Sequence, residues 1–328
     1  MTLVNKATVT AVVVSYNRPQ LLRECLDGLA AQTRPADRVI VIDNASTDGA
    51  PAVARDHPIG ADVVELTRNY GGAGGFCAGM ALALDAAVTP DFLWVMDDDT
   101  IPTPTALNEL LKAAQACREA NGTLPTVLGS RTLWTDGREH PMSRPRPRTW
   151  LFRGERELPA AEGDERPFQA RSMSFVSCLV NAQAMLTIGA LPRTAFFLWN
   201  DDFEFTTRLL KRGIGYYVPA SEVVHKTKVF GSSDADPGER FRFEVRNKIW
   251  MMRACRGDFT AFEYAEFLLK TVRRWALTFA RSGDRALLCR CGMEGLREAL
   301  GGLPASNAEL LAAESEVRRA VEAIEAAR

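Results

Sequence analysis

Three consecutive carboxylates, Asp97, Asp98 and Asp99, follow a five-residue apolar run at residues 92–96. Such a run is typical of a strand buried on both faces, and open α/β sheets bind their ligands at the carboxyl ends of these strands. Alternate side chains of an extended segment point the same way, so Asp97 and Asp99 can reach one divalent cation. Oxygen ligands of this kind favour Mg²⁺ or Mn²⁺ holding a diphosphate. The alternative interpretation is a surface turn in which an aspartate caps the following helix.

A second acidic block, Asp201, Asp202 and Glu204, directly follows an aromatic run at residues 196–199. Carboxylates in the first turn of a helix also stabilise the helix dipole, so this block has a structural interpretation beside a catalytic one. Further along the chain, His225 ends a strand-like apolar segment. A lone histidine is more often structural than a ligand, and both interpretations stay open at this point.

Polar residues also follow three other strand-like segments, at residues 9–14, 39–42 and 63–66. These polar residues are Ser15, Asn17 and Arg18 after the first segment, Asp43 and Asn44 after the second, and Arg68 and Asn69 after the third. Because the segments alternate with helical patterns, they predict a parallel, doubly wound sheet with right-handed crossovers. We therefore expect these polar residues to share one rim of the sheet with the aspartates, where a ligand crevice lies.

The glycine-rich run at residues 71–75 does not have the register of a dinucleotide-binding fingerprint, since it follows the third strand and not the first. It can be a flexible connector or a phosphate contact, and the sequence favours neither. A helix is expected at residues 76–88, and a last helix at 308–328 after the capping-box pair Ser306 and Glu309.

Two basic segments have open interpretations. Residues 136–164 form a charged, proline-bearing stretch, for which a solvated loop is favoured over a patch that binds an anionic acceptor. Its arginines are Arg144, Arg146, Arg148, Arg153 and Arg156. Residues 259–281 predict an amphipathic helix with aromatic and basic side chains, which could pack on the rest of the protein or lie on an anionic membrane surface.

The composition is ordinary for a soluble globular enzyme, with 46% hydrophobic and 25% charged residues. The net charge of −1 gives no support to nucleic-acid binding. The seven scattered cysteines indicate reduced thiols, and their spacing predicts no zinc site. No apolar run reaches the ~18 residues that span a bilayer, and the N-terminus lacks a signal-peptide pattern. We therefore expect a cytoplasmic protein that contacts a membrane only from outside.

Taken together, these motifs resemble the inverting GT-A-fold glycosyltransferases of family two, over about residues 8 to 255. The resemblance rests on residues 12–18, 41–48 and 68–76 and on the aspartates 97–99. The stretch Asn-x-Gly-Gly-x-Gly-Gly-Phe from Asn69, the block from Trp199 to Asp202, and the pair Arg246 and Asn247 are most similar to bacterial galactofuranosyltransferases that start a galactan, and to rhamnosyltransferases.

The resemblance implies a GT-A catalytic domain at residues 1–257 and a C-terminal helical region at 258–328. Within the domain, residues 1–134 would bind the nucleotide sugar and 135–257 the acceptor. Asp43 would pair with uracil, and the other nucleotide-site residues would be Ser15, Asn17, Arg18, Asn44, Asn69, Gly74, Gly75 and Asp98. Asp97, Asp99 and His225 would bind Mn²⁺ or Mg²⁺. Asp202 matches the catalytic base, with Asp201 beside it as the alternative.

The implied reaction moves a sugar with inversion, from a donor such as UDP-galactofuranose to a lipid-linked or cell-surface glycan at the inner face of the membrane. A polyprenyl-diphosphate-linked acceptor fits this resemblance, and dTDP-rhamnose is the alternative donor. A nucleotidyltransferase is less favoured because no lysine-bearing glycine-rich turn follows the first strand. An inactive nucleotide-sugar-binding protein would have no need of Asp202.

Overall fold

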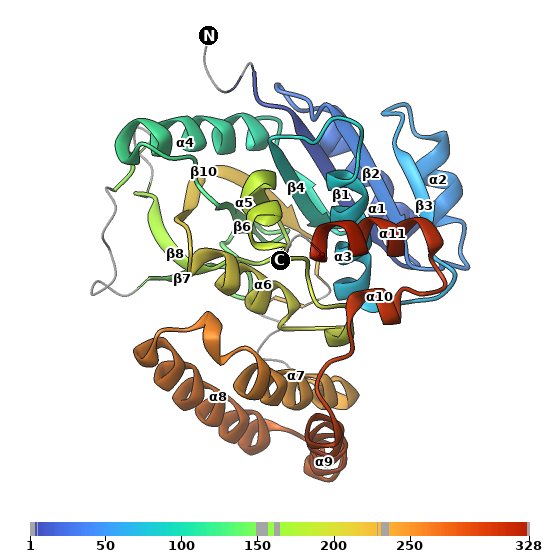
Figure 1. The fold of residues 1–328 in the computed structure, drawn as a ribbon, viewed down its shortest axis with the longest axis vertical. Coiled ribbons are helices and arrows are strands. Elements are labelled where there is room, and N and C mark those ends of the chain that lie inside the picture. Colours follow the sequence, from blue (N-terminus) through green and yellow to red (C-terminus); the bar gives the residue numbers. More distant parts are fainter. Residues whose placement is uncertain are drawn as a thin grey trace.

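A computed structural model describes residues 4, 6–148, 157–160, 165–227, 229–230 and 236–326. In this part of the chain, a central sheet of ten strands has helices on both faces (Figure 1). The strands are β1 Val9–Ser15, β2 Arg38–Asp43, β3 Asp62–Glu65, β4 Phe92–Asp97, β5 Thr100–Pro102, β6 Val127–Leu133, β7 Arg146–Pro147, β8 Phe168–Ser172, β9 Cys178–Asn181 and β10 Gly215–His225.

The α-helices are α1 Pro19–Ala30, α2 Ala50–Asp56, α3 Gly71–Leu84, α4 Ala106–Asn121, α5 Ala182–Ile188, α6 Asp201–Leu210, α7 Phe241–Ala254, α8 Ala261–Arg281, α9 Arg285–Gly301, α10 Asn307–Leu310 and α11 Ser315–Glu325. The described residues also include the short 3₁₀ turns η3 Thr194–Phe196, η5 Gly238–Arg240 and η6 Arg256–Asp258.

The strand order is β3-β2-β1-β4-β9-β6-β10-β8-β7, with β5 paired to β10 outside this path. Strands β3, β2, β1 and β4 run parallel, which confirms the predicted doubly wound half of the sheet. Strand β9 is inserted antiparallel between β4 and β6, while β6 and β10 are parallel. The carboxyl ends of β1, β2 and β4 therefore meet at one rim, as we expected from the alternation of elements.

Strand β1 shows why the apolar runs form buried strands. Its residues Val9, Ala11 and Val13 pack with α1 and α4 on one face of the sheet. Val12 and Val14 pack with α3 and α11 on the other face. Helices thus cover both faces, and every residue of β1 is buried.

Helix α3 begins at Gly71, five residues before the expected start, and ends at Leu84. The glycines of this helix allow it to pack closely on the sheet. A Cβ at Gly75 would lie 2.5 Å from Val14 Cγ1, and one at Gly79 would lie 2.4 Å from Val12 Cγ1. The expectation of a loop at residues 71–75 was therefore wrong.

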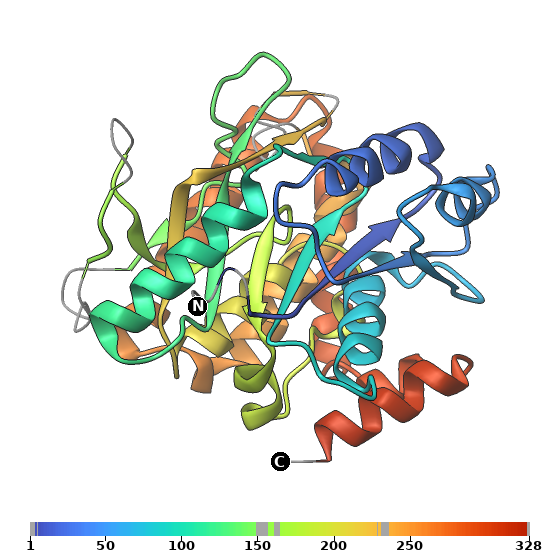
Figure 2. The ribbon, with the colours of Figure 1, turned by 90° about the horizontal axis from the view of Figure 1, so that it is seen from above.

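The C-terminal region divides into two parts. Helices α7, α8 and α9 form a layer below the sheet in Figure 1, and Phe259 and Phe267 share one apolar cluster with Phe196 and Trp250. The predicted last helix is two helices, α10 and α11, and the capping box of Ser306 is present. Helix α11 returns to pack beside α3 (Figure 2).

None of the helices in the described ranges is both long enough and apolar enough to cross a bilayer. All seven cysteines are unpaired; six are buried and Cys289 is exposed.

Candidate active site

Strand pairing brings a histidine to the acidic end of β4. Strand β5 turns back after Asp99 and pairs antiparallel with β10, which places His225 opposite Thr100. As a result, His225 Nε2 lies 3.2 Å from Asp99 Oδ1. One ligand atom from each of Asp97, Asp99 and His225 lies within 4.8 Å of the others. The three candidate metal ligands predicted from the sequence are therefore brought together.

Two carboxylate oxygens and one imidazole nitrogen are a suitable donor set for Mn²⁺ or Mg²⁺. His225 Nδ1 is buried without a hydrogen-bond partner among the described residues, whereas the buried Asp99 Oδ1 contacts His225 Nε2. Burial and the charges of Asp99 and Asp98 raise the pKa of Asp97 well above its ordinary value. Because a bound cation would offset this crowding of negative charge, the residues fit a divalent metal.

Asp98 points away from this cluster and holds the end of β1 in place. Its carboxylate accepts hydrogen bonds from Ser15 Oγ at 3.0 Å, Tyr16 N at 3.2 Å and Arg18 Nη1 at 3.2 Å. The Arg18 guanidinium also donates to Asp99 Oδ2 at 2.8 Å. Asp98 is not part of the pocket lining, so the structure gives it a positioning role for Ser15 and Arg18.

At the end of β2, one oxygen of a buried carboxylate has no hydrogen-bond donor among the described residues. Asp43 is 1% exposed; its Oδ2 accepts from Ser46 N at 2.8 Å, while Oδ1 has no partner among the described residues. Asn17 borders the same corner, where its Oδ1 accepts from Thr47 N at 2.8 Å. The end of β2 thus holds a buried carboxylate oxygen that lacks a donor among the described residues, although Asp43 does not line the pocket described below.

Other predicted nucleotide residues build the loop before α3. Asn44 Nδ2 donates to Gly71 O at 3.0 Å, and Asn69 Oδ1 accepts from Gly71 N at 2.7 Å. Gly74 and Gly75 are buried within α3 and do not line the pocket, whereas Gly72 does. The two glycines are required for packing, because a Cβ at Gly74 would lie 2.3 Å from the Tyr70 Cβ.

The second acidic block lies at the N-terminus of α6, after a strained turn at residues 197–200. Phe197, Trp199 and Asn200 have φ angles of 60°, 66° and 65°, a region that non-glycine residues rarely adopt. The Asn247 side chain on α7 stabilises this turn by donating to the carbonyls of Phe196, Leu198 and Trp199 at 2.9, 3.0 and 2.8 Å.

Two further contacts hold the turn. Arg246 Nη2 donates to the carbonyls of Ala195 and Phe196, each at 2.9 Å. Asn200 Nδ2 donates to Glu244 Oε2 at 2.9 Å. The pair Arg246 and Asn247, noted in the sequence as a similarity, thus fixes the start of α6.

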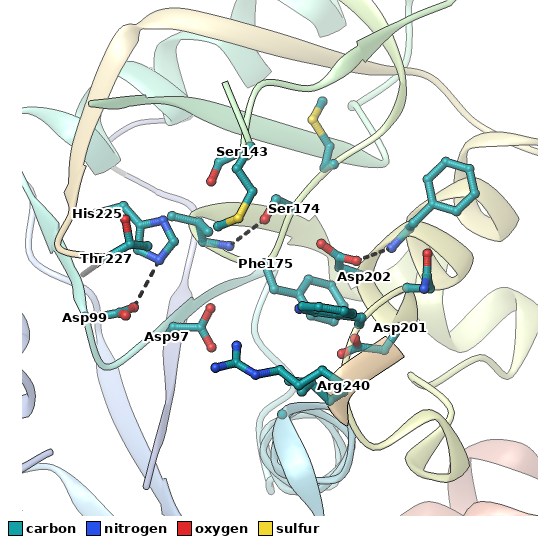
Figure 3. Close-up of a pocket in the computed structure, with 18 of the residues that line it drawn as sticks. Asp97, Asp99, Ser143, Ser174, Phe175, Asp201, Asp202, His225, Thr227 and Arg240 are labelled. Carbon is teal, nitrogen blue, oxygen red and sulfur yellow. Dashed lines mark hydrogen bonds and ion pairs between the residues drawn. The ribbon is translucent and has the colours of Figure 1, made fainter. Parts of the chain in front are cut away.

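Asp201 and Asp202 face the metal-ligand cluster across one pocket of about 720 Å³ (Figure 3). The pocket is also lined by Arg18, Asp97, Asp99 and His225. Glu204 does not line it; this buried carboxylate pairs with Arg193 at 3.0 Å and Arg208 at 3.1 Å. The structure therefore brings the two distant acidic segments to opposite sides of one cavity and assigns Glu204 to the interior.

The two aspartates of α6 differ in their electrostatics. Burial and the charge of Asp202 raise the pKa of Asp201 to about 8. Burial also raises the pKa of Asp202, but its hydrogen bond from Phe203 N and the charges of Lys248 and Arg146 oppose the rise. Burial thus raises the pKa of both carboxyls, and the surroundings of Asp202 favour its ionised form more than those of Asp201 do.

The pocket is also lined by Lys248, Glu244 and Arg274, which the sequence analysis did not assign to a site, and by Arg146, which it did consider. Lys248 and Glu244 come from α7, Arg274 from α8 and Arg146 from β7. The position of Arg146 in the pocket lining corrects the expectation of a solvated loop at residues 136–164. Residues 149–156 and 161–164, with Arg153 and Arg156, lie outside the described residues. The sequence signal for this part of the pocket was the helical spacing of Glu244 and Lys248, which are polar residues on the buried face of α7.

Comparison with known proteins agrees with this geometry. Residues 10–181 match the model of glycosyl transferase family 2. Galactofuranosyltransferase GlfT1 of Mycobacterium tuberculosis (strain ATCC 25618 / H37Rv) is 31% identical over 259 residues, which cover 75% of this chain and 82% of that protein.

Two solved structures share the fold. S. aureus TarS superposes with a TM-score of 0.61 at 14% identity; the match covers 97% of this chain and 55% of TarS, so the chain spans just over half of that protein. Mannosyltransferase PcManGT from Pyrobaculum calidifontis, in complex with GDP-Man and Mn²⁺, has a TM-score of 0.52 at 19% identity, covering 98% of this chain and 84% of that one. The chain therefore belongs to glycosyl transferase family 2 and is a glycosyltransferase with the GT-A fold.

Proposed function

We propose that this glycosyltransferase moves galactofuranose from UDP-galactofuranose, with inversion, to a lipid-linked or cell-surface glycan. The observation that carries the proposal is the pocket in which Asp201 and Asp202 face Asp97, Asp99 and His225. The similarity to GlfT1 over 75% of the chain supports galactofuranose as the sugar. The acceptor would be used in cell-wall or polysaccharide synthesis.

Asp202 acts as the base in this proposal. Its carboxylate takes the proton of the acceptor hydroxyl while the hydroxyl oxygen forms a bond to the anomeric carbon of the sugar. The bond from that carbon to the diphosphate oxygen breaks on the opposite face, and UDP leaves with the electron pair. A positioned base contributes ~10²–10⁴-fold to such a rate. Asp201, whose pKa burial raises, would hydrogen-bond the sugar or the acceptor.

Asp97, Asp99 and His225 would hold Mn²⁺ or Mg²⁺, which supplies charge neutralisation to the departing diphosphate. Among the solved structures that share the fold, PcManGT carries Mn²⁺. Arg18 lies against Asp99 and completes the diphosphate side of the pocket.

The nucleoside would lie on the rim formed by β1 and β2. Asp43 Oδ1, which has no donor among the described residues, would accept a hydrogen bond from the N3–H group of uracil; the missing donor supports this pairing. Ser15, Asn17 and Asn69 do not line the pocket, so in this proposal they support the nucleotide site from behind it. TarS has been crystallised with UDP and with UDP-GlcNAc, which agrees with a uridine nucleotide in this fold.

The outer face of α8 supports a lipid-linked acceptor at the inner face of the cell membrane. Four exposed apolar residues recur along it at helical spacing, and cations lie among them. The apolar residues are Phe262, Leu269, Val272 and Phe279, and the exposed cations are Lys270, Arg273 and Arg281. Such a face binds anionic membrane surfaces, so we propose a peripheral contact through α8.

A donor panel tests the proposed function. The protein is incubated with Mn²⁺ and UDP-galactofuranose, UDP-galactopyranose or dTDP-rhamnose, and the release of UDP or dTDP is measured. We expect UDP-galactofuranose to be consumed fastest, and faster consumption of dTDP-rhamnose would overturn the choice of donor.

The role of Asp202 is tested separately. Asp202→Asn should retain UDP affinity and lose about 10²–10⁴-fold in turnover, because only the base is removed. Asp85→Asn, which removes an exposed carboxylate outside the pocket, is the matched control and should leave turnover unchanged. Full turnover by Asp202→Asn would exclude Asp202 as the base.

A further inference from the structure

Three cations from separate elements line the pocket, and we refer to Arg146, Lys248 and Arg274 as the basic wall. Arg146 comes from β7, Lys248 from α7 and Arg274 from α8. The carboxylate of Glu244 faces them, with its Oε1 3.7 Å from Arg274 Nε. Asp202 is a second carboxylate near the wall, and Glu266 also acts on Arg146.

Lys248 is the most unusual member of the basic wall. Its side chain lines the pocket although the residue is only 4% exposed. Its Nζ lies 4.7 Å from the ring centroid of Phe203 and 4.8 Å from that of Phe267. Among the described residues, this ammonium has no hydrogen-bond acceptor and no ion pair within 4 Å. A buried ammonium without an acceptor is unfavourable, so the site is built for a partner that comes from outside the chain.

Arg146 also lacks an acceptor within the described ranges. Its guanidinium lies 5.1 Å from the Phe203 ring centroid and, within the described ranges, has no hydrogen bond or ion pair. Burial lowers the pKa of Arg146, and the charges of Arg171 and Arg274 add to this effect. Burial likewise lowers the pKa of Lys248 to about 8; Glu244 opposes this change, and Arg146 and Arg274 reinforce it. The cations therefore destabilise one another, and an anion between them would relieve the repulsion.

The position of the basic wall indicates which substrate carries that anion. The diphosphate of the donor belongs with Asp97, Asp99 and His225 across the pocket, whereas Lys248 and Arg146 act on the pKa of Asp202. The wall is therefore on the side from which the acceptor hydroxyl approaches. Arg274 also belongs to α8, whose outer face carries the exposed apolar residues.

Resting on the proposed function, we propose that the basic wall is a subsite for a phosphate or diphosphate group of the acceptor. Arg146 and Lys248 donate hydrogen bonds to its oxygens, and Arg274 adds charge. Such a subsite selects acceptors that carry an anionic group near the sugar and orients their hydroxyl toward Asp202. The donor diphosphate has the same chemistry, so the test must separate the two sources.

Sulfate is the probe for the binding test, and it requires no transferase activity. The Tm of the protein is measured in sodium sulfate and in sodium chloride of equal ionic strength, with and without saturating UDP and Mg²⁺. Because sulfate also stabilises proteins nonspecifically, the comparison is with Arg146→Gln/Lys248→Gln and with the control Lys112→Gln, which removes an exposed cation on α4. We expect a larger sulfate shift in the wild type and in the control than in the double variant, whether or not UDP is present.

Two results would overturn the subsite. An equal sulfate shift in the double variant would show that the basic wall does not bind the anion. Loss of the wild-type shift when UDP is added would assign the anion site to the donor. If Lys248→Gln does not fold, Arg146→Gln alone, at a half-buried position, makes the same comparison.

A kinetic comparison is the second test of the subsite. The variant and the wild type are compared on one acceptor sugar presented as a phosphodiester-linked lipid and as a neutral alkyl glycoside. We expect the KM for the phosphorylated acceptor to rise about 10- to 100-fold in the variant, the range for loss of a charge-assisted hydrogen bond, with the donor KM unchanged. An equal rise for both acceptors would contradict an anion subsite. If no transfer occurs at all, the proposed function fails, and the sulfate experiment still decides the subsite.

Discussion

Asn247 is the residue whose replacement best tests how the fold positions the base. Its amide donates to three carbonyls of the turn at residues 195–200, directly before Asp201 and Asp202. Leucine has a similar size but no donor, so Asn247→Leu removes these hydrogen bonds with little change in volume. Without these hydrogen bonds, the strained backbone of Phe197, Trp199 and Asn200, with its positive φ angles, is less well stabilised.

The expected magnitudes follow from this geometry. The NH₂ group of Asn247 has two hydrogens for the three carbonyls, so about two hydrogen bonds of about 0.5–1.5 kcal/mol each are lost, and the free energy of unfolding should fall by about 1–3 kcal/mol. Relaxation of the turn would displace the N-terminus of α6, and a displacement of about 1 Å at a reacting group reduces turnover about 10²-fold. The nucleotide site proposed above lies at the ends of β1 and β2, away from this turn, so UDP affinity should change little.

The assay combines urea unfolding, turnover at saturating substrates, and UDP titration in Mn²⁺. Asn108→Leu on α4 is the control, because its amide donates only to the side chain of the adjacent Glu109 among the described residues. A folded Asn247→Leu protein with wild-type turnover would refute the view that this amide holds the base in place. Equal losses of turnover and of UDP affinity would also refute it, since they indicate general unfolding.

Two further predictions concern the carboxylates of the pocket. Asp99→Ala should weaken Mn²⁺-dependent UDP binding and leave binding without metal unchanged; calorimetric titration with and without Mn²⁺ measures this, and an unaltered Mn²⁺ effect would remove Asp99 from the metal site. Burial and the charge of Asp202 raise the pKa of Asp201 to about 8, above the ordinary value of about 4. The stability that the protonated carboxyl contributes is therefore complete below pH about 4 and is lost as the pH rises through 8. Asp201→Asn should therefore flatten the fall in unfolding free energy between pH 6 and 8, and urea unfolding with an unchanged slope would contradict the raised pKa.

Much of the fold and part of the site could be predicted from local sequence pattern. The apolar runs that end at Ser15, Asp43 and Asp97 are buried strands whose carboxyl ends share one rim, because strands of this kind are parallel and doubly wound. Asp97 and Asp99 follow from the alternation of side chains along one strand. Gly74 and Gly75 show the limit of such patterns, since glycines required for close packing and glycines that contact phosphate look the same in a sequence.

The sequence by itself determined which strands form, where their polar ends lie, and which carboxylates are available, since each depends on neighbours a few residues apart. Only the tertiary structure decided which distant groups meet. His225 reaches Asp99 because β5 pairs antiparallel with β10, and Asn247 reaches the turn before Asp202 because α7 packs beneath it. The basic wall likewise joins Arg146, Lys248 and Arg274 from three elements. Long-range packing sets these contacts, and no local periodicity encodes it.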